Sequence, residues 1–284
     1  MSAAQAGTVT LGGDLTVNRL GFGAMRLTGP GVWGPPADRA ACVRLLRRAV
    51  DLGVNFIDTA DSYGPYVSEE IIHEALHPYD GLVIATKAGL LRTAPDKWIP
   101  LANPHYLRQE VEMSLRRLGV ERIDLFQLHR VDRHIPLADQ LGELVTLRDE
   151  GKIRHLGLSQ VSVKWLDAAQ KITPIVSVQN RYNLADRKDD PVLDAAAERG
   201  VAFIPWAPLA AGPLIAADGP LAGLAAARGV TPSQLALAWL LKRSPAMLPI
   251  PGTANVEHLE QNVAAAEITL TDAEFDELAA AAAG

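Results

Sequence analysis

The sequence predicts an α/β fold, a single-domain (β/α)8 TIM barrel. Short apolar, strand-like runs alternate with longer helix-like segments along the whole chain, and this alternation implies parallel strands. The 284 residues, 48% of them hydrophobic, can bury the core of one barrel. No low-complexity linker divides the chain, so we expect residues 1–284 to form one domain.

The elements begin with a hairpin, because strand-like residues 8–11 and 15–17 flank a Gly-Gly-Asp turn. We expect this hairpin to close the bottom of the barrel. Two later helices, at 221–227 and 271–282, depart from a strict repeat and are expected to brace the barrel. The strand-like runs are 19–23, 55–59, 82–86, 124–128, 155–159, 174–179, 202–205 and 247–250. The helix-like segments are 38–52, 68–76, 104–118, 137–150, 163–170, 190–199, 221–227, 232–242 and 271–282.

Capping residues mark several helix boundaries. Asn103 precedes Pro104, which places a cap before a first-turn proline. Thr231 and Thr271 are each followed three residues later by Gln or Glu, the pattern of a capping box. Gly53 closes the first predicted helix. These local signals support the proposed alternation.

Composition and charge argue against several classes of partner. The net charge is −6 and runs of Lys and Arg are no longer than pairs, so nucleic acid is not an expected partner. Cys42 is the only cysteine, which leaves no internal disulfide, and its apolar surroundings indicate a buried thiol. Residues 1–7 lack signal-peptide features, and no apolar run approaches a membrane span. We therefore expect a cytoplasmic monomer that does not bind membranes.

Polar side chains occur where three of the strand-like runs end. Asp58, Lys87 and His129 each stand where an apolar run gives way to polar residues, and Tyr63 lies five positions after Asp58. In a (β/α)8 barrel these strand ends form the rim that carries the active site. The four residues are therefore expected to lie together.

This quartet resembles the catalytic set of the aldo-keto reductases, and the resemblance extends from residues 19–23 to residues 250–253. It implies reduction of an aldehyde or ketone by hydride from a nicotinamide cofactor, with Tyr63 as proton donor. A phenol with a pKa of about 10 is a weak acid unless a cation stabilises its phenolate. We expect Lys87 to be that cation, Asp58 to hold Lys87, and His129 to orient the carbonyl oxygen.

Each residue alone has a simpler interpretation. A lone Asp or Lys at a strand end is usually an ion pair or a cap, a Tyr after a turn is usually half-buried filler, and a His is usually a satisfied polar residue. The four together at matching strand ends make the catalytic interpretation far more specific.

The sequence does not support a dinucleotide-binding glycine loop as the cofactor site, because residues 21–26 have only the first two glycines and Arg26 stands in place of the third. The resemblance implies instead an extended dinucleotide across the barrel mouth, with Trp206 under the nicotinamide ring. The simpler interpretation of Trp206 is a tryptophan of the hydrophobic core. The simpler interpretation of Ser159, Gln160 and Gln179 is that they cap the loop backbone at strand ends. The implied cofactor-binding residues are Gly23, Ala24, Met25, Asp58, Ser159, Gln160, Gln179, Trp206, Ala207, Pro208, Leu209, Ile250, Gly252, Thr253, His258, Gln261 and Asn262.

The adenosine end departs from the family's frequent pattern. Gly252 and His258 stand where the family often has a lysine and an arginine that face the 2′-phosphate. Thr253, the amides of the following helix start and a partly protonated His258 can still hold that phosphate, and Gln261 and Asn262 would bond the adenine. We expect NADPH as the cofactor, with NADH as the alternative.

One segment, His73-Glu74-Ala75-Leu76-His77, matches the H-E-x-x-H zinc motif. Both histidines face away from the apolar stripe of the predicted helix, and Pro78 stops that helix directly after the second one. With no third ligand nearby in the sequence, we expect solvated histidines and no metal.

The long loops are expected to form the substrate pocket. An aromatic mouth suits a bulky or aromatic aldehyde, although the two loop tryptophans can equally be loop anchors. Residues 29–34 and 251–253 look like those of a bacterial branch that includes pyridoxal reductases, which makes pyridoxal a candidate substrate. The candidate substrate residues are Trp33, Trp98 and His129, with Met25, His134 and Arg181 nearby.

Two other functions fit parts of the pattern. Some barrels of this appearance, such as potassium-channel β-subunits, bind the nucleotide to sense redox state and regulate a partner. A hydrolase or lyase on the same fold would leave Trp206, Gln179 and Ser159 without a purpose. The chain shows no obvious docking extension, which favours the enzyme.

Overall fold

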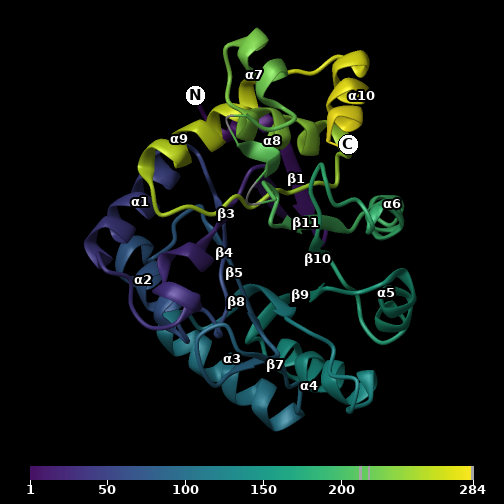
Figure 1. Ribbon diagram of the computed structural model, residues 1–284. Coiled ribbons are helices and arrows are strands. Elements are labelled where there is room, and N and C mark those ends of the chain that lie inside the picture. The colour runs from purple at the N-terminus through teal and green to yellow at the C-terminus, as the bar shows by residue number, and fades with distance from the viewer. Residues whose placement is uncertain (211–212, 217, 283–284) are drawn as a thin grey trace.

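The computed structural model describes residues 1–210, 213–216 and 218–282. Seven parallel strands form one curled sheet in the order β11-β10-β9-β8-β5-β4-β3, and helices surround it on the outside (Figure 1). The strands are β3 (Phe22–Gly23), β4 (Phe56–Asp58), β5 (Val83–Ala88), β8 (Ile123–Leu128), β9 (Ile153–Ser159), β10 (Ser177–Arg181) and β11 (Ala202–Trp206). The predicted alternation of strands and helices is confirmed.

The predicted eighth strand, at 247–250, is an extended segment with a single β-bridge, from Met247 to Phe203. Its backbone nevertheless contacts both edges of the sheet, because the Leu248 amide donates to the Phe203 carbonyl (2.8 Å) and the Gly21 amide donates to the Pro249 carbonyl (2.9 Å). Proline has no amide hydrogen to donate, so this segment cannot form a continuous ladder. The structure therefore has a short bridging segment where the sequence predicted a regular strand.

The helices begin close to where their caps predict. Asn103 accepts a hydrogen bond from the His105 amide, and the capping boxes at Thr231 and Thr271 are both formed. The α-helices are α1 (Arg39–Asp51), α2 (Val67–Leu76), α3 (Pro104–Leu118), α4 (Leu137–Asp149), α5 (Val163–Gln170), α6 (Asp190–Glu198), α7 (Ala222–Arg228), α8 (Pro232–Arg243), α9 (Val256–Ala264) and α10 (Asp272–Ala281). Short 3₁₀ helices cover Ala3–Ala6, Ala24–Leu27, Pro30–Val32, Pro213–Ile215 and Ala265–Glu267.

The predicted N-terminal hairpin is formed by β1 (Thr8–Leu11) and β2 (Leu15–Asn18). Its side chains Leu11, Leu15 and Val17 are buried in one cluster with inward-facing residues of the curled sheet, among them Phe56 and Leu125. The hairpin therefore covers the interior of the sheet, as the sequence predicts.

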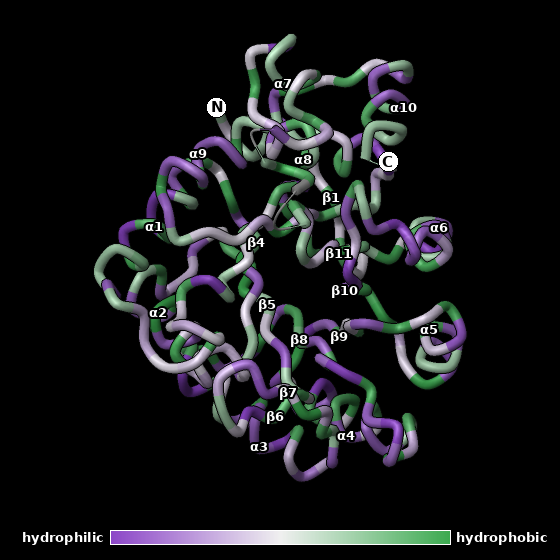
Figure 2. Tube along the Cα trace, viewed as in Figure 1, coloured by the Kyte–Doolittle hydropathy of each residue, from purple (hydrophilic) through white to green (hydrophobic). Residues whose placement is uncertain are grey.

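Larger apolar clusters lie between the sheet and the helices. Figure 2 shows hydrophobic and hydrophilic residues alternating along the outer helices, the pattern of elements with one buried face. In α4, for example, Leu141, Leu144 and Leu147 are fully buried, and burying one such side chain contributes about 1.5–3 kcal/mol. Cys42 of α1 is also buried, as predicted. Within the described ranges no helix is both long and apolar enough to cross a membrane.

Two loops frame the end of the sheet where the strands finish. A short antiparallel pair that the sequence analysis missed, β6 (Leu90–Arg92) and β7 (Trp98–Pro100), follows β5. The loop at 29–36 meets the segment after β4 through a bridge between Trp33 and Gly64. The sequence also predicts a long rim loop at 210–220, of which residues 211, 212 and 217 lie outside the described residues.

Candidate active site

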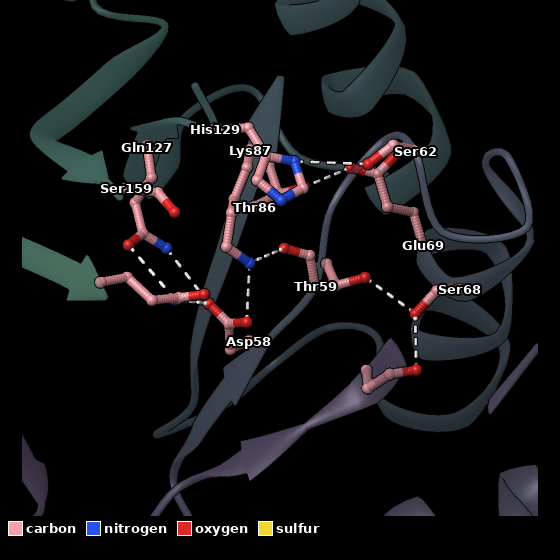
Figure 3. Close-up of polar contacts among 12 residues, drawn as sticks. Asp58, Thr59, Ser62, Ser68, Glu69, Thr86, Lys87, Gln127, His129 and Ser159 are labelled. Atoms are coloured by element: carbon pink, nitrogen blue, oxygen red, sulfur yellow. Dashed lines mark hydrogen bonds and ion pairs between the residues drawn. The ribbon is translucent and has the colours of Figure 1, made fainter. Parts of the chain in front are cut away.

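The predicted quartet comes together at one end of the sheet. Asp58 is the last residue of β4, Lys87 lies near the end of β5 and His129 directly follows β8. The register places Asp58 beside Ala85 of β5, and Lys87 beside Gln127 of β8. Figure 3 shows Lys87 reaching toward Asp58 and the His129 ring facing the loop that follows β4. Parallel strands with ends at one edge therefore bring these distant residues into contact.

Lys87 is completely buried, and its ammonium group makes two short bonds. Its Nζ donates to Asp58 Oδ2 at 2.7 Å and to the Thr59 carbonyl at 2.7 Å. Burial alone would lower the pKa of Lys87, but the charge of Asp58 and its hydrogen bond outweigh burial and raise that pKa. Lys87 therefore remains charged in a dry environment.

The second oxygen of Asp58 is held by two amides. Oδ1 accepts from Gln127 Nε2 at 3.1 Å and from Gln179 Nε2 at 2.8 Å. Gln127 was not predicted as a site residue, although an amide inside the apolar run of β8 was a usable signal. Gln179 was expected to grip the cofactor, and in this structure its amide NH2 supports Asp58. Both amides fix the carboxylate that anchors Lys87.

Tyr63 lies in the turn after β4 and is only 7% exposed. Lys87 Nζ lies 5.3 Å from the centroid of its ring. Burial raises the pKa of Tyr63, and the charge of Lys87 lowers it without cancelling the effect of burial. The net pKa is therefore raised, which differs from the simple expectation of a more acidic phenol. The main reason is burial, and Asp58, which also raises this pKa, offsets part of the effect of the lysine's charge.

His129 is buried and faces both Tyr63 and Ser62. Its Nδ1 lies 3.3 Å from Ser62 Oγ, and its ring meets the Tyr63 ring edge to face with centroids 5.9 Å apart. Burial and the positive charges of Lys87, Arg130 and Arg92 lower its pKa well below 6.5. The imidazole is therefore neutral at physiological pH and has one N–H to donate.

The two loop tryptophans are anchored by a buried arginine. The Arg92 guanidinium lies 3.6 Å from the centroid of the Trp98 ring and 5.7 Å from that of Trp33. It also donates to the carbonyl of Ser62, one residue before Tyr63, at 2.9 Å. Trp98 in turn meets the Tyr63 ring edge to face at 6.4 Å. Both tryptophans are thus loop anchors beside Tyr63, and contact with substrate stays a prediction. No sequence signal distinguished Arg92.

The predicted nicotinamide residues gather at the ends of neighbouring strands. Ser159 ends β9, Gln160 directly follows it, and Trp206 ends β11. The Trp206 indole donates to Gln160 Oε1 at 2.9 Å, and Ser159 Oγ accepts from Arg130 Nη1 at 3.0 Å. Trp206 is half-buried, so it is not a core tryptophan.

The loop at 250–253 lies against the end of β3. A Cβ added to Gly252 would lie 2.5 Å from the Gly23 carbonyl oxygen, and one added to Gly23 would lie 2.7 Å from the Ile250 carbonyl oxygen. Contacts this short do not occur for real side chains, so both positions require glycine. Gly252, where the resemblance led us to look for a lysine, therefore has a packing reason, since a side chain there would push the two backbones apart.

The predicted adenosine-site residues lie on and before α9. Asn255 caps this helix by accepting from the Glu257 and His258 amides, and Thr253 Oγ1 accepts from the Asn255 amide at 3.0 Å. The His258 side chain is exposed, whereas Asn262 is buried. Of the remaining predicted cofactor residues, Ala24 and Met25 follow β3, Ala207, Pro208 and Leu209 follow β11, and Gln261 lies on α9.

Several predicted candidates have other contacts. Arg181 pairs with Asp186 at 3.2 Å, and His134 is exposed. His73 and His77 of the zinc-like motif lie 3.1 and 3.2 Å from the carbonyl oxygens of Leu118 and Gly119 at the end of α3. The two histidines are therefore not merely solvated, because they contact the end of a neighbouring helix.

A groove of about 430 Å³ lies at the other end of the sheet, before β10 and β11. It is lined by Gly12, Gly13, and residues 170–176 and 199–201. Arg199, one of the cations that line this groove, is neutralised by an ion pair with Asp167 at 2.7 Å. The chemistry-bearing residues lie at the opposite, carboxyl end of the strands.

Comparisons with known proteins agree with this geometry. The sequence model of the aldo/keto reductase family matches residues 19–283. An uncharacterised oxidoreductase from Schizosaccharomyces pombe is 53% identical over 98% of this chain and 90% of its own length. Pyridoxine 4-dehydrogenase from Escherichia coli is 46% identical over 93% of this chain and 94% of its own. The crystal structure of an aldo-keto reductase from Klebsiella pneumoniae in complex with NADPH superposes with a TM-score of 0.82, at 30% identity, over 95% of this chain and 93% of the other.

Proposed function

Because this chain belongs to the aldo/keto reductase family, we propose that it is an NADPH-dependent carbonyl reductase that converts an aldehyde or ketone to the alcohol. The observation that carries the proposal is the fully buried Lys87–Asp58 ion pair beside Tyr63 and neutral His129. A buried ion pair is weak evidence for stability alone, and its position next to a phenol favours a catalytic role.

The fold supports the same proposal. The seven parallel strands and the bridging segment at 247–250 together correspond to a (β/α)8 barrel, with the N-terminal hairpin closing the bottom and α10 as an addition after the last unit. In such barrels the active site lies at the carboxyl ends of the strands, where the quartet stands. We propose one domain acting as a monomer in the cytoplasm.

The residues at the ends of β9, β10 and β11 fit a nicotinamide dinucleotide. Ser159 and the side-chain amides of Gln160 and Gln179 offer donors and acceptors for a carboxamide. The bond from the Trp206 indole to Gln160 fixes the edge of the indole ring. The Arg181 guanidinium lies over one face of the indole, 5.7 Å from its centroid, which leaves the other face for stacking. When bound, the cofactor supplies hydride to the carbonyl carbon. Thr253 and His258 would hold the 2′-phosphate, which is why we propose NADPH before NADH.

The chain's own residues would handle the carbonyl oxygen and its proton. His129, neutral at physiological pH, donates a hydrogen bond that orients the oxygen toward Tyr63. Because its pKa is raised, Tyr63 is fully protonated before the reaction and can give that proton to the oxygen as the alcohol forms. Lys87 then stabilises the phenolate, and Asp58 keeps Lys87 charged until solvent returns the proton.

We propose pyridoxal as the first substrate to test. The Escherichia coli relative is named for the reverse chemistry on pyridoxine. The Trp98 ring contacts Tyr63, and the Trp33 ring lies against the same Arg92 guanidinium as Trp98. A flat aromatic aldehyde suits a site beside these aromatic rings.

The test is turnover. Purified protein is mixed with NADPH and pyridoxal or benzaldehyde, and the absorbance of the reduced cofactor is followed. Tyr63→Phe should lower kcat by about 10²–10⁴-fold while changing NADPH affinity less than about twofold, because the phenol acts on the carbonyl. Tyr66→Phe, the same chemical change at an exposed tyrosine three positions on, should retain the rate.

Full activity in Tyr63→Phe would refute the proton-donor role. Tight NADPH binding without turnover on any aldehyde or ketone would instead indicate a redox-sensing subunit of the kind known from potassium-channel β-subunits.

A further inference from the structure

Arg130 follows the candidate catalytic histidine directly, at the end of β8. Its Nη1 donates to the His129 carbonyl at 2.6 Å and to Ser159 Oγ at 3.0 Å. These two contacts place the guanidinium between the residue that orients the carbonyl and a residue proposed to hold the nicotinamide.

The charge of the Arg130 guanidinium also lowers the pKa of two residues of the candidate active site. Burial raises the pKa of Tyr63, and the charges of Lys87 and Arg130 both lower it. Burial lowers the pKa of His129, and Arg130 lowers it further. A charge that acts on both side chains lies beside the space where a carbonyl compound must bind.

Arg130 has unused hydrogen-bonding capacity. Among the residues that the structure describes, no carboxylate oxygen lies within ion-pair distance of its guanidinium, and its Nε and Nη2 make no hydrogen bonds. By contrast, Arg117, which is also partly buried, contacts Glu69 and Glu110. Arg19 donates instead to backbone carbonyls, and the Arg187 guanidinium lies over the Trp239 ring. Arg92, which also lacks a carboxylate partner, donates instead to several backbone carbonyls. A half-buried cation with free donors beside a ligand site favours the binding of an anion there.

We propose that Arg130 is an anion-recognition subsite that selects carbonyl substrates carrying an oxyanion, a carboxylate or a phenolate, near the carbonyl group. Nε and Nη2 would bind the oxyanion while Nη1 keeps its bonds to His129 and Ser159. The inference deepens the proposed carbonyl reduction and rests on it. It assigns a substrate class that the quartet alone does not define, and pyridoxal, with a phenol next to its aldehyde, belongs to that class.

The experiment compares matched substrate pairs. For carboxylates, kcat/KM is measured for 2-, 3- and 4-formylbenzoate against their methyl esters. For phenolates, pyridoxal is compared with its 3-O-methyl ether. Charge-assisted hydrogen bonds predict a preference of about tenfold or more for an anionic member. The substrate series in which this preference is observed, carboxylates or phenolates, identifies which oxyanion the subsite binds.

Variants of Arg130 distinguish a role in substrate recognition from a purely structural role. Arg130→Met should reduce the preference to within about twofold, and Arg130→Lys should keep part of it. Arg133→Met removes the same charge from an exposed position three residues on and should leave the preference unchanged. If Arg130→Met weakened anionic and neutral substrates equally, the arginine would be only structural and the proposal would be overturned.

A binding measurement makes the result independent of turnover. Calorimetry of benzoate with the NADP⁺ complex of the wild type should show affinity that Arg130→Met weakens by about tenfold. If no aldehyde is reduced but this difference holds, the subsite stands and the proposed reaction fails. If neutral aldehydes are reduced as well as anionic ones and benzoate binding is the same in both proteins, the subsite is refuted and the reaction stands.

Discussion

Replacing Lys87 with methionine should destabilise the protein strongly, because it leaves the Asp58 carboxylate buried without its cation. Asp58 Oδ1 would keep its bonds from Gln127 and Gln179, but Oδ2 would lose the 2.7 Å contact with Nζ. Removing one partner of a buried pair costs about 3–5 kcal/mol. The pair is completely buried, so solvent cannot compensate.

Removing both charges should lower the free energy of unfolding by less than the sum of the two single substitutions. In the double variant Asp58→Asn with Lys87→Met no uncompensated charge remains, so we expect a coupling energy of about 2–3 kcal/mol between the two positions. The pair Lys242–Asp272 has the same 2.7 Å contact, but Asp272 is 98% exposed. Lys242→Met should therefore cost less than about 1 kcal/mol.

Urea denaturation followed by tryptophan fluorescence gives the free energy of unfolding of each variant. Lys87→Met should lower the melting temperature by roughly 6–20 °C and should also abolish aldehyde reduction. Additive effects at Asp58 and Lys87, or a loss at Lys87 no larger than at Lys242, would show that the buried pair is not the coupled unit described here.

Three further predictions concern packing and protonation. Gly252→Ala should lower the free energy of unfolding by about 1–3 kcal/mol, because the added Cβ would lie 2.5 Å from the Gly23 carbonyl; unchanged stability in a urea titration would contradict the close approach. Asp61 is fully buried, and burial followed by the charges of Glu110 and Glu69 raises its pKa well above 3.8. The folded state therefore keeps a proton that the unfolded state releases above about pH 4, so stability falls as pH rises toward the folded pKa. Asp61→Asn should be at least about 1 kcal/mol more stable than wild type at pH 8 and should lose this advantage near pH 4, and an equal difference at both pH values would refute the assignment. Since the pKa of His129 is lowered, kcat/KM should be flat between about pH 6 and 8, and an inflection near pH 6.5 that disappears in His129→Gln would contradict a neutral histidine.

The sequence by itself determined the order of elements and much of the rim. Helix starts at Asn103, Thr231 and Thr271 could be predicted because capping depends on residues within one turn of each other. Asp58 and Lys87 could be placed at the rim because a change from apolar to polar residues marks the end of a buried strand. Both patterns depend on residues that are close together in the chain, so the sequence alone reveals them.

Only the tertiary structure decided what those residues contact. Gln127, Arg92 and Arg130 gain their roles from partners 29 to 69 positions away, and no local pattern encodes such a partner. The raised pKa of Tyr63 is likewise a balance between burial and charges that meet only in the folded state. Local propensity depends on neighbours in the chain, whereas burial and electrostatics depend on neighbours in space. The sequence could therefore predict which groups stand at the rim, and only the fold decided which of them are paired and which are free to bind.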